Sequence, residues 1–485
     1  MLFQDLEKLI FSLSTSEKKR FTTYSKNVNA KKIYMVLFEE ILLSKNNPIS
    51  NWQDIFKNNF PKSSLESASN YLLKTLTDFL IQNRIEQNSW YQQLHGLMKA
   101  QLCFERSIPD RGLKEISNVY KKAKESENLK NLYQAVRMEL DTLHNLNFSN
   151  IDEQYIIDKQ LEAKLLLKSI HEIQDHYNLY ELLSYRLANN PIMEENTDDL
   201  ILGELNLTFN NRKNIFETKK IHLLFQSHYF INKGDYQSAL LIFSDLVNQF
   251  ETNPTLWNYP PYDYLSTLDG IINSLRNTHQ FEEMLPFLEK IQTLLLDNYP
   301  EHFKNIAKAT SDIYLIQFHI FKNELPQAKS LCNKIENIIF ADTEKHIEYY
   351  YFQALTFYLL EEYQKTKQIL NELFIVYPTY ISFSIYRNSK LLYIMTILKN
   401  QHDQEYIDSE IRAYKRLFQK RGKLLQIEKL IFKIISLKPQ LRGKEWKKKF
   451  METHLKQFEK IIAENKENSL IKNFDYKNWI KSIFS

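Results

Sequence analysis

The segment from Thr343 to Pro378 constrains the fold most, because its pattern predicts two helices joined by a tight turn. Aromatic, small and apolar residues recur along it at helical spacing, in the order Tyr350, Gln353, Ala354, Phe357, Thr366 and Leu370. Two antiparallel helices cross closely only where side chains are small, so we expect Ala354 and Thr366 at the crossing. Pro378 lacks an amide hydrogen and should end the second helix.

Three earlier segments repeat this pattern. The positions equivalent to Thr366 are Ala239, Met284 and Ala328, and successive steps between them are 45, 44 and 38 residues. The residue order resembles the tetratricopeptide repeat family, whose standard unit has about 34 residues. The resemblance implies an all-α, tetratricopeptide-like solenoid of antiparallel helix pairs. The longer steps indicate longer helices and variable loops, and Met284 stands where the family prefers alanine.

The two ends of the chain carry a second, looser resemblance. The opening LEKLIFSLSTSEKKRF and the closing FDYKNWIKSIF resemble the ends of uncharacterised bacterial helical-repeat proteins of similar length. No activity comes with this resemblance.

Helical patterning suggests four regions: an N-terminal helical unit over residues 1–86, divergent helix pairs over 87–215, tetratricopeptide-like repeats over 216–405 and a basic helical cap over 406–485. Ser14 and Glu17 have the spacing of a capping box that opens a second helix. One helix is expected from Ile151 to about His176. Residues 188–215 are the least regular part, so we expect a joint or a long loop there.

Several function classes are disfavoured by residue content. Seven glycines do not form a phosphate-binding loop or a G-x-S-x-G elbow, and no acid-base pair stands out, so we expect neither an enzyme nor a cofactor. Cys103 and Cys332 lie far apart, which favours a reducing, cytoplasmic setting. No run of about 18 apolar residues occurs, so we expect no membrane span.

The histidines predict no metal site from local spacing. His171 and His176 flank Glu172 in the manner of a zinc-binding helix, but they are five residues apart, whereas one helix face needs four. His222 and His228 are six apart. We therefore expect these histidines to be packed or solvated.

Polar and aromatic residues remain on the first helix of each repeat after the packed stripe is assigned. In tetratricopeptide arrays this face turns inward, and its mixture of amide, charged and aromatic groups suits an extended peptide. The expected partner-binding residues are Asp269, Asn273, Arg276, Asn277, Tyr314, Phe318, Tyr351 and Tyr358. The sequence therefore favours a non-catalytic scaffold for a protein or peptide, although these residues could instead make solvated or interhelix contacts.

The C-terminal region is basic within a chain of net charge +4. Residues 411–485 contain 20 Lys and Arg against 7 Asp and Glu, whereas residues 1–410 contain 43 against 52. Such a region could bind nucleic acid or an acidic membrane surface, or pack on the acidic body. Trp446 and Phe450 flank one basic run and could stack on bases. The basic patch comprises Lys415, Arg416, Lys420, Arg421, Lys447, Lys448 and Lys449.

Overall fold

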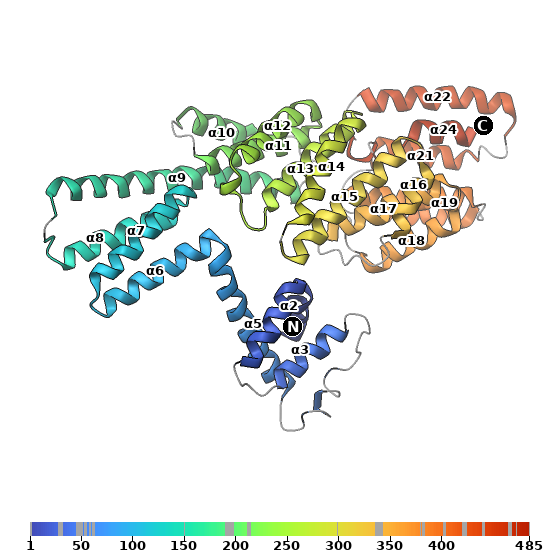
Figure 1. Cartoon of the computed structure of the whole chain (residues 1–485). Helices are drawn as coiled ribbons and strands as arrows, with labels where there is room; N and C mark the ends of the chain where they lie inside the picture. Colours follow the sequence, from blue (N-terminus) through green and yellow to red (C-terminus); the bar gives the residue numbers. More distant parts are fainter. Residues whose placement is uncertain are drawn as a thin grey trace.

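The structure, a computed structural model, is an all-α solenoid of tetratricopeptide-like helix pairs, as the sequence predicted (Figure 1). Its described residues contain helices, turns and loops without a strand. They are residues 2–27, 33–44, 52, 56–57, 60, 64–149, 151–189, 198–210, 215–297, 299–334, 343–378, 380, 384–400, 404–419, 424–438, 442–463, 468–471 and 473–484. Within these ranges, no helix combines the length and the apolar character that crossing a membrane requires.

An N-terminal unit packs around its own apolar core. Its helices are α1 (Leu2–Ser12), α2 (Thr15–Asn27), α3 (Ile33–Ser44) and α5 (Leu65–Gln87). The ring of Phe21 lies 5.0 Å from that of Phe38 and 5.3 Å from that of Phe79, and all three are buried. The predicted capping box is confirmed, because the Ser14 amide donates to the Glu17 carboxylate at 2.9 Å and the Glu17 amide donates to Ser14 Oγ at 3.2 Å.

The next five helices in the described part of the chain follow the N-terminal unit. They are α6 (Ser89–Glu105), α7 (Pro109–Glu125), α8 (Leu129–Asn145), α9 (Glu153–Asn189) and α10 (Asp198–Asn210). The prediction that a helix ends near His176 was wrong, because α9 continues for 37 residues. The expected loop over 188–215 was also wrong in part, since α10 lies within it and packs on α9.

The central pairs follow the predicted register. They comprise α11 (Phe216–Lys233), α12 (Tyr236–Thr252), η2 (Pro254–Leu256), α13 (Tyr262–Asn277), η3 (Phe281–Met284), α14 (Leu285–Leu296), α15 (Glu301–Phe321), α16 (Leu325–Lys334), α17 (Thr343–Leu359), α18 (Tyr363–Val376) and α19 (Ser384–Lys399). Ala354 and Thr366 are fully buried between α17 and α18. The second helix ends two residues before Pro378, which confirms the predicted stop.

Two glycines show how the chain makes tight connections. Gly234 ends α11 with a φ of 73°, a left-handed conformation that glycine adopts without a steric penalty. Gly270 lies where α13 crosses α12, and a β-carbon there would stand 2.1 Å from Cζ of Phe243. Helix crossing therefore requires a missing side chain at Gly270.

The C-terminal helices continue the same body. They are α20 (Gln404–Gln419), α21 (Gln426–Ser436), α22 (Lys444–Ala463), α23 (Asn468–Ile471) and α24 (Tyr476–Phe484). One apolar core runs from Ile313 on α15 to Phe484 on α24, so there is no break in the core at the expected boundary between residues 405 and 406. The last helices complete the core of the preceding pairs.

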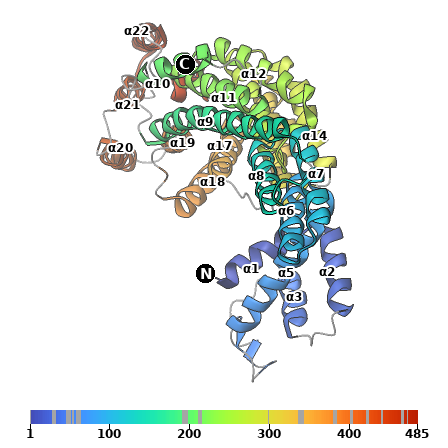
Figure 2. The same cartoon turned by 90° about the vertical axis from the view of Figure 1, so that its left-hand side faces the viewer.

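The helix pairs follow a curved path. Figure 2 shows the N-terminal unit at one end of this path and the C-terminal helices at the other. In Figure 1, α5 descends from α6 to the N-terminal unit, and the long helix α9 connects the α6–α8 region to the central pairs. Helices α8, α10 and α11 all pack on α9.

Candidate functional site

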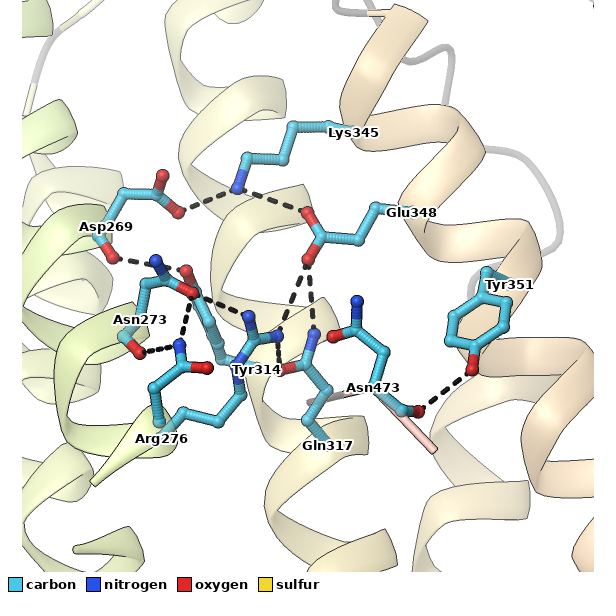
Figure 3. A network of polar contacts seen from close by, with 10 residues as sticks. Asp269, Asn273, Arg276, Tyr314, Gln317, Lys345, Glu348, Tyr351 and Asn473 are labelled. Atoms are coloured by element: carbon cyan, nitrogen blue, oxygen red, sulfur yellow. Dashed lines mark hydrogen bonds and ion pairs between the residues drawn. The ribbon is translucent and has the colours of Figure 1, made fainter. Parts of the chain in front are cut away.

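The predicted inner face is present, but it is a closed polar network (Figure 3). Arg276 on α13 donates to Gln317 on α15 at 2.5 Å and lies 3.8 Å from Glu348 on α17. Lys345 on α17 donates to Asp269 at 2.7 Å and lies 3.4 Å from Glu348. The hydroxyl of Tyr314 donates to the Asp269 backbone carbonyl at 3.1 Å. Two cations and two carboxylates therefore balance each other across three first helices.

The largely buried ammonium of Lys345 stays charged because two carboxylates lie beside it. Burial alone would lower the pKa of Lys345, but Asp269 and Glu348 outweigh it and raise that pKa well above its ordinary value. The pKa of the Tyr314 hydroxyl is also raised, mainly by burial. These groups keep their charge states over the physiological pH range, so the network ties α13, α15 and α17 together.

The aromatic end of the predicted face is covered by the chain itself. Tyr351 is completely buried, and its hydroxyl donates to the Asn473 carbonyl at 2.9 Å. The Tyr358 ring lies 6.0 Å from that of Phe474. The C-terminal segment thus occupies the surface on which a peptide was expected.

Most of the predicted partner-binding residues are buried in the structure. Five of the eight predicted residues are at most 9% exposed, namely Arg276, Tyr314, Phe318, Tyr351 and Tyr358. The other three are half-buried, and Asn273 accepts from both Arg276, at 2.6 Å, and Asn277, at 3.1 Å. Side chains from neighbouring first helices and from the C-terminal segment fill this face. Its role in binding a partner stays a prediction.

The predicted basic patch is divided between separate helices. Lys415 and Arg416 lie on α20, which packs on α19, whereas α22 packs on α21 and α24. Lys447, Lys448 and Lys449 lie on α22, and Lys420 and Arg421 lie outside the described residues. Figure 2 shows α20 and α22 apart, with α21 between them. This arrangement does not support a single surface for nucleic acid.

The aromatic pair beside the basic run is already engaged. The rings of Trp446 and Phe450 stack on each other at 4.1 Å, with an angle of 20° between their planes. Both are half-buried against the C-terminal core. Each ring therefore already uses one of its faces to stack on the other, where the sequence suggested stacking on nucleic-acid bases.

A cleft that the sequence did not predict lies beside α9. We call it the aromatic cleft. It has a volume of about 630 Å³ and is bounded by the start of α6, the α7–α8 turn, the middle of α9, the start of α11 and the η2–α13 connection. The residues that line it are Asn88, Ser89, Trp90, Tyr91, Gln93, Ser126, Glu127, Asn128, Leu129, Lys130, Ile170, Ile173, Gln174, Tyr177, Phe216, Glu217, Thr255, Leu256, Trp257, Asn258 and Tyr259.

The first wall of the aromatic cleft is fixed by caps and buried amides. Asn88 caps α6 by accepting from the amide of Trp90 at 2.9 Å, which places Trp90 in the first turn with 51% of its surface exposed. Buried Gln93 donates to Ser126 at 2.8 Å and accepts from Asn131 at 3.0 Å. Because Gln93 joins α6, α7 and α8, this wall is preorganised.

The second wall is fixed by aromatic contacts. The indole of Trp257 donates to the Phe250 carbonyl at 2.8 Å and stacks on the Tyr264 ring at 4.4 Å. The guanidinium of Arg84 lies 4.5 Å from the centre of the Tyr259 ring. Aromatic side chains from the start of α6 (Trp90 and Tyr91) and from the η2–α13 connection (Trp257 and Tyr259) therefore line the cleft.

The carboxylates of the aromatic cleft have structural partners. Glu127 accepts a hydrogen bond from the backbone amide of Phe216 at 2.9 Å. This bond satisfies one of the amides in the first turn of α11, which have no partner within the helix. Glu217 accepts from the Tyr177 hydroxyl and lies 2.9 Å from Lys220. Burial, followed by the hydrogen bond to Glu217, raises the pKa of Tyr177. Groups that hold the walls in this way suit recognition of a ligand better than proton transfer to it.

An apolar groove continues from the aromatic cleft along α9 and shares Leu129 with it. The groove has a volume of about 420 Å³ and is lined by Leu129, Asp158, Leu161, Glu162, Leu165, Leu166, Ser169 and Ile215. Leu161 and Leu165 are 54% and 45% exposed, one helical turn apart. The aromatic cleft and this groove therefore adjoin each other along α9.

One group of side chains within the described ranges has the composition of a metal site. It consists of His176, Glu204 and His222, which come from α9, α10 and α11. Local spacing predicted none, because the three residues belong to different helices.

Comparisons with known proteins add little to this picture. No protein-family model and no curated protein matches the chain. Among solved structures, the chain is similar to the TPR domain in the crystal structure of P58(IPK), with 12% sequence identity, over 73% of this chain and 95% of that chain. The TM-score is 0.23. Because this likeness is weak, the fold is defined by the helix pairing described above.

Proposed function

We propose that the protein is a non-catalytic scaffold that binds an extended segment of a protein partner in the aromatic cleft and its apolar groove. The observation that carries this proposal is a cleft of about 630 Å³ with aromatic walls, beside a groove with exposed leucines. Large apolar surfaces flanked by polar groups are typical of sites for protein partners.

The length of the combined site suits a peptide. Asp158 in the groove and Tyr177 in the aromatic cleft are 19 residues apart on one helix. A helical rise of about 1.5 Å per residue gives roughly 28 Å between them. An extended chain advances about 3.3 Å per residue, so a segment of roughly eight residues fits this length.

The chemistry of the walls defines the segment. Leu161, Leu165 and Ile215 can receive an aliphatic side chain in the groove, whereas Trp90 and Trp257 can contact an aromatic or proline ring in the cleft. Amides such as Gln174 and Asn258 can bond to the peptide backbone at the rim. The bound segment is therefore apolar at one end and aromatic or proline-containing at the other.

The inner-face network has a supporting role in this proposal. Arg276, Lys345 and Glu348 hold successive repeats in register, which fixes the curved path that presents α9. The predicted contacts of Tyr351 and Tyr358 with a partner would require the C-terminal segment to leave its place.

The test is affinity capture from cell lysate at high salt with nuclease added. The bait is the full chain, compared with a Trp90→Ala/Leu161→Glu variant in which both altered residues are more than half exposed. The matched control is Met98→Glu/Leu241→Glu, because those side chains are 68% and 70% exposed and do not line the cleft or the groove. We expect the wild type and the control variant to capture the same partner protein. The cleft variant should fail to capture it. Equal capture by all three baits would overturn the proposal.

A further inference from the structure

Three helices bring two imidazoles to one buried carboxylate oxygen. Nδ1 of His176 on α9 lies 2.9 Å from Oε1 of Glu204 on α10, and Nδ1 of His222 on α11 lies 2.6 Å from the same oxygen. His176 and Glu204 are 2% and 3% exposed, and the side chain of His222 is 19% exposed. The three ligand atoms lie within 4.8 Å of one another.

The buried ammonium group of Lys220 lies near this cluster but pairs with other carboxylates. Lys220, two residues before His222, lies 2.9 Å from Glu217 and 2.7 Å from Asp263. The cluster of His176, Glu204 and His222 holds the charge of a buried carboxylate. A bound divalent cation would neutralise that charge.

We propose that His176, Glu204 and His222 form a binding site for a divalent transition metal ion, with Zn²⁺ as the fitting class. Two imidazoles and one carboxylate are a known zinc ligand set, and a carboxylate with imidazoles disfavours the softer Cu(I). Neighbouring ligand atoms in a tetrahedral zinc site lie about 3.3 Å apart, given bonds of about 2.0–2.2 Å. The two spacings between imidazole nitrogen and Glu204 Oε1, 2.9 and 2.6 Å, would have to widen by about 0.4 and 0.7 Å to reach this value.

The set leaves a coordination position for a fourth ligand. The partial exposure of His222 places the solvent path on its side of the cluster, whereas His176 and Glu204 are enclosed. A water molecule or a donor from another molecule completes the coordination there. The site thus differs from a closed structural zinc site with four protein ligands.

The metal would connect α10 to α9 and α11, two helices that already pack on each other. α10 packs on α9, and a metal held by Glu204 adds a link from α10 to both α9 and α11. Metal binding to the folded state stabilises it in proportion to the logarithm of free metal concentration. Zn²⁺ should therefore raise the melting temperature of the full chain.

The test uses the full-length protein, stripped of metal by a chelator and dialysed. Zn²⁺ is titrated by calorimetry, bound metal is counted by elemental analysis, and Co²⁺ is added separately because its visible absorption reports tetrahedral coordination. The variants are Glu204→Gln, which keeps the size of the side chain, and His222→Gln. The matched control is His171→Gln, since His171 lies on α9 with 78% of its side chain exposed. Circular dichroism checks the helical content of each variant.

We expect one equivalent of Zn²⁺ in wild type and in His171→Gln, with a tetrahedral Co²⁺ spectrum and an increased melting temperature. Glu204→Gln and His222→Gln should weaken binding by about 100-fold or more, because even loss of a second-shell partner costs about 10–100-fold. If Glu204→Gln loses helical content, the affinity of wild type is compared with that of His222→Gln alone, because His222 is partly exposed and its replacement is less disruptive. Failure of wild type to bind one equivalent, or equal affinity in His222→Gln, would show that the cluster is only a hydrogen-bonded histidine–glutamate group.

Discussion

The hydroxyl of Tyr351 on α17 donates a hydrogen bond of 2.9 Å to the backbone carbonyl of Asn473, which lies 122 residues later in the chain. This bond is buried, and Tyr476 three residues further on donates to Asn388 on α19 at 3.3 Å. The C-terminal segment is thereby fixed against two first helices. The end of the chain closes the last repeats, where an array of helix pairs otherwise leaves an apolar surface.

We predict that Tyr351→Phe lowers the free energy of unfolding by about 1–2 kcal/mol, because the buried Asn473 carbonyl loses its donor while the ring keeps its packing. Chemical denaturation monitored by circular dichroism measures the change. The control is Tyr71→Phe on α5. Because Tyr71 is 52% exposed, this substitution should change the free energy of unfolding by less than about 0.5 kcal/mol. Equal effects in the two variants would contradict the structural role of the bond.

The difference between Ala354 and Tyr351 shows what local sequence can predict. Ala354 packs against the helix that follows directly, so residue size at helical spacing identified its place in the crossing. Tyr351 is on the same helix, but its environment depends on a segment more than 100 residues away. Periodicity therefore predicted the repeat architecture, while it did not show which first-helix residues the C-terminal segment covers.

The buried pair of Arg276 and Glu348 provides a second prediction. Arg276→Met should cost about 3–5 kcal/mol, since Glu348, Gln317 and Asn273 lose a charged donor in the interior. Adding Glu348→Gln should restore at least about 1 kcal/mol, because the two groups share one network. Urea denaturation of both single variants and the double variant measures this coupling.

An exposed pair on another helix is the matched control for that cycle. Arg137 and Asp141 are 43% and 63% exposed at their side chains, so Arg137→Met should cost no more than about 0.5 kcal/mol. Strict additivity of Arg276→Met and Glu348→Gln would mean that these groups act independently, in conflict with the network.

The sequence did not predict the aromatic cleft or the histidine cluster, because both are formed by residues that lie far apart in the chain. Trp90 and Trp257 stand at helix starts and connections, outside the apolar stripes that helical spacing reveals. His176 and His222 are 46 residues apart, and the packing of α10 and α11 on α9 brings both to Glu204. The signal available in the sequence was two tryptophans placed off the repeat pattern.

Gly270 gives a prediction of opposite sign to the usual helix rule. Gly→Ala in an open helix stabilises by about 0.5–1 kcal/mol. Gly270→Ala should instead destabilise by about 1–3 kcal/mol, because its β-carbon would stand 2.1 Å from Cζ of Phe243. Thermal unfolding measures the change, and Phe243→Leu in the same chain should recover part of it. Gly443→Ala is the control, since a β-carbon at Gly443 has open space around it.

Asp312 on α15 should make a pH-dependent contribution to stability. Burial raises the pKa of its carboxyl from 3.8 to about 6, and Lys308 offsets only part of this. The folded state then binds more protons than the unfolded state between about pH 4 and pH 6, so this group lowers stability as pH rises through that window.

Asp312→Asn should therefore leave stability unchanged near pH 4 and increase it by about 1–2 kcal/mol at pH 7. One pKa unit corresponds to about 1.4 kcal/mol, and the partial exposure of Asp312 reduces the full value. Denaturation midpoints of wild type and variant across this pH range measure the difference. Asp141→Asn, at a carboxylate with 63% exposure, is the control. A constant offset between wild type and Asp312→Asn from pH 4 to pH 7 would show that the carboxyl does not titrate in this window.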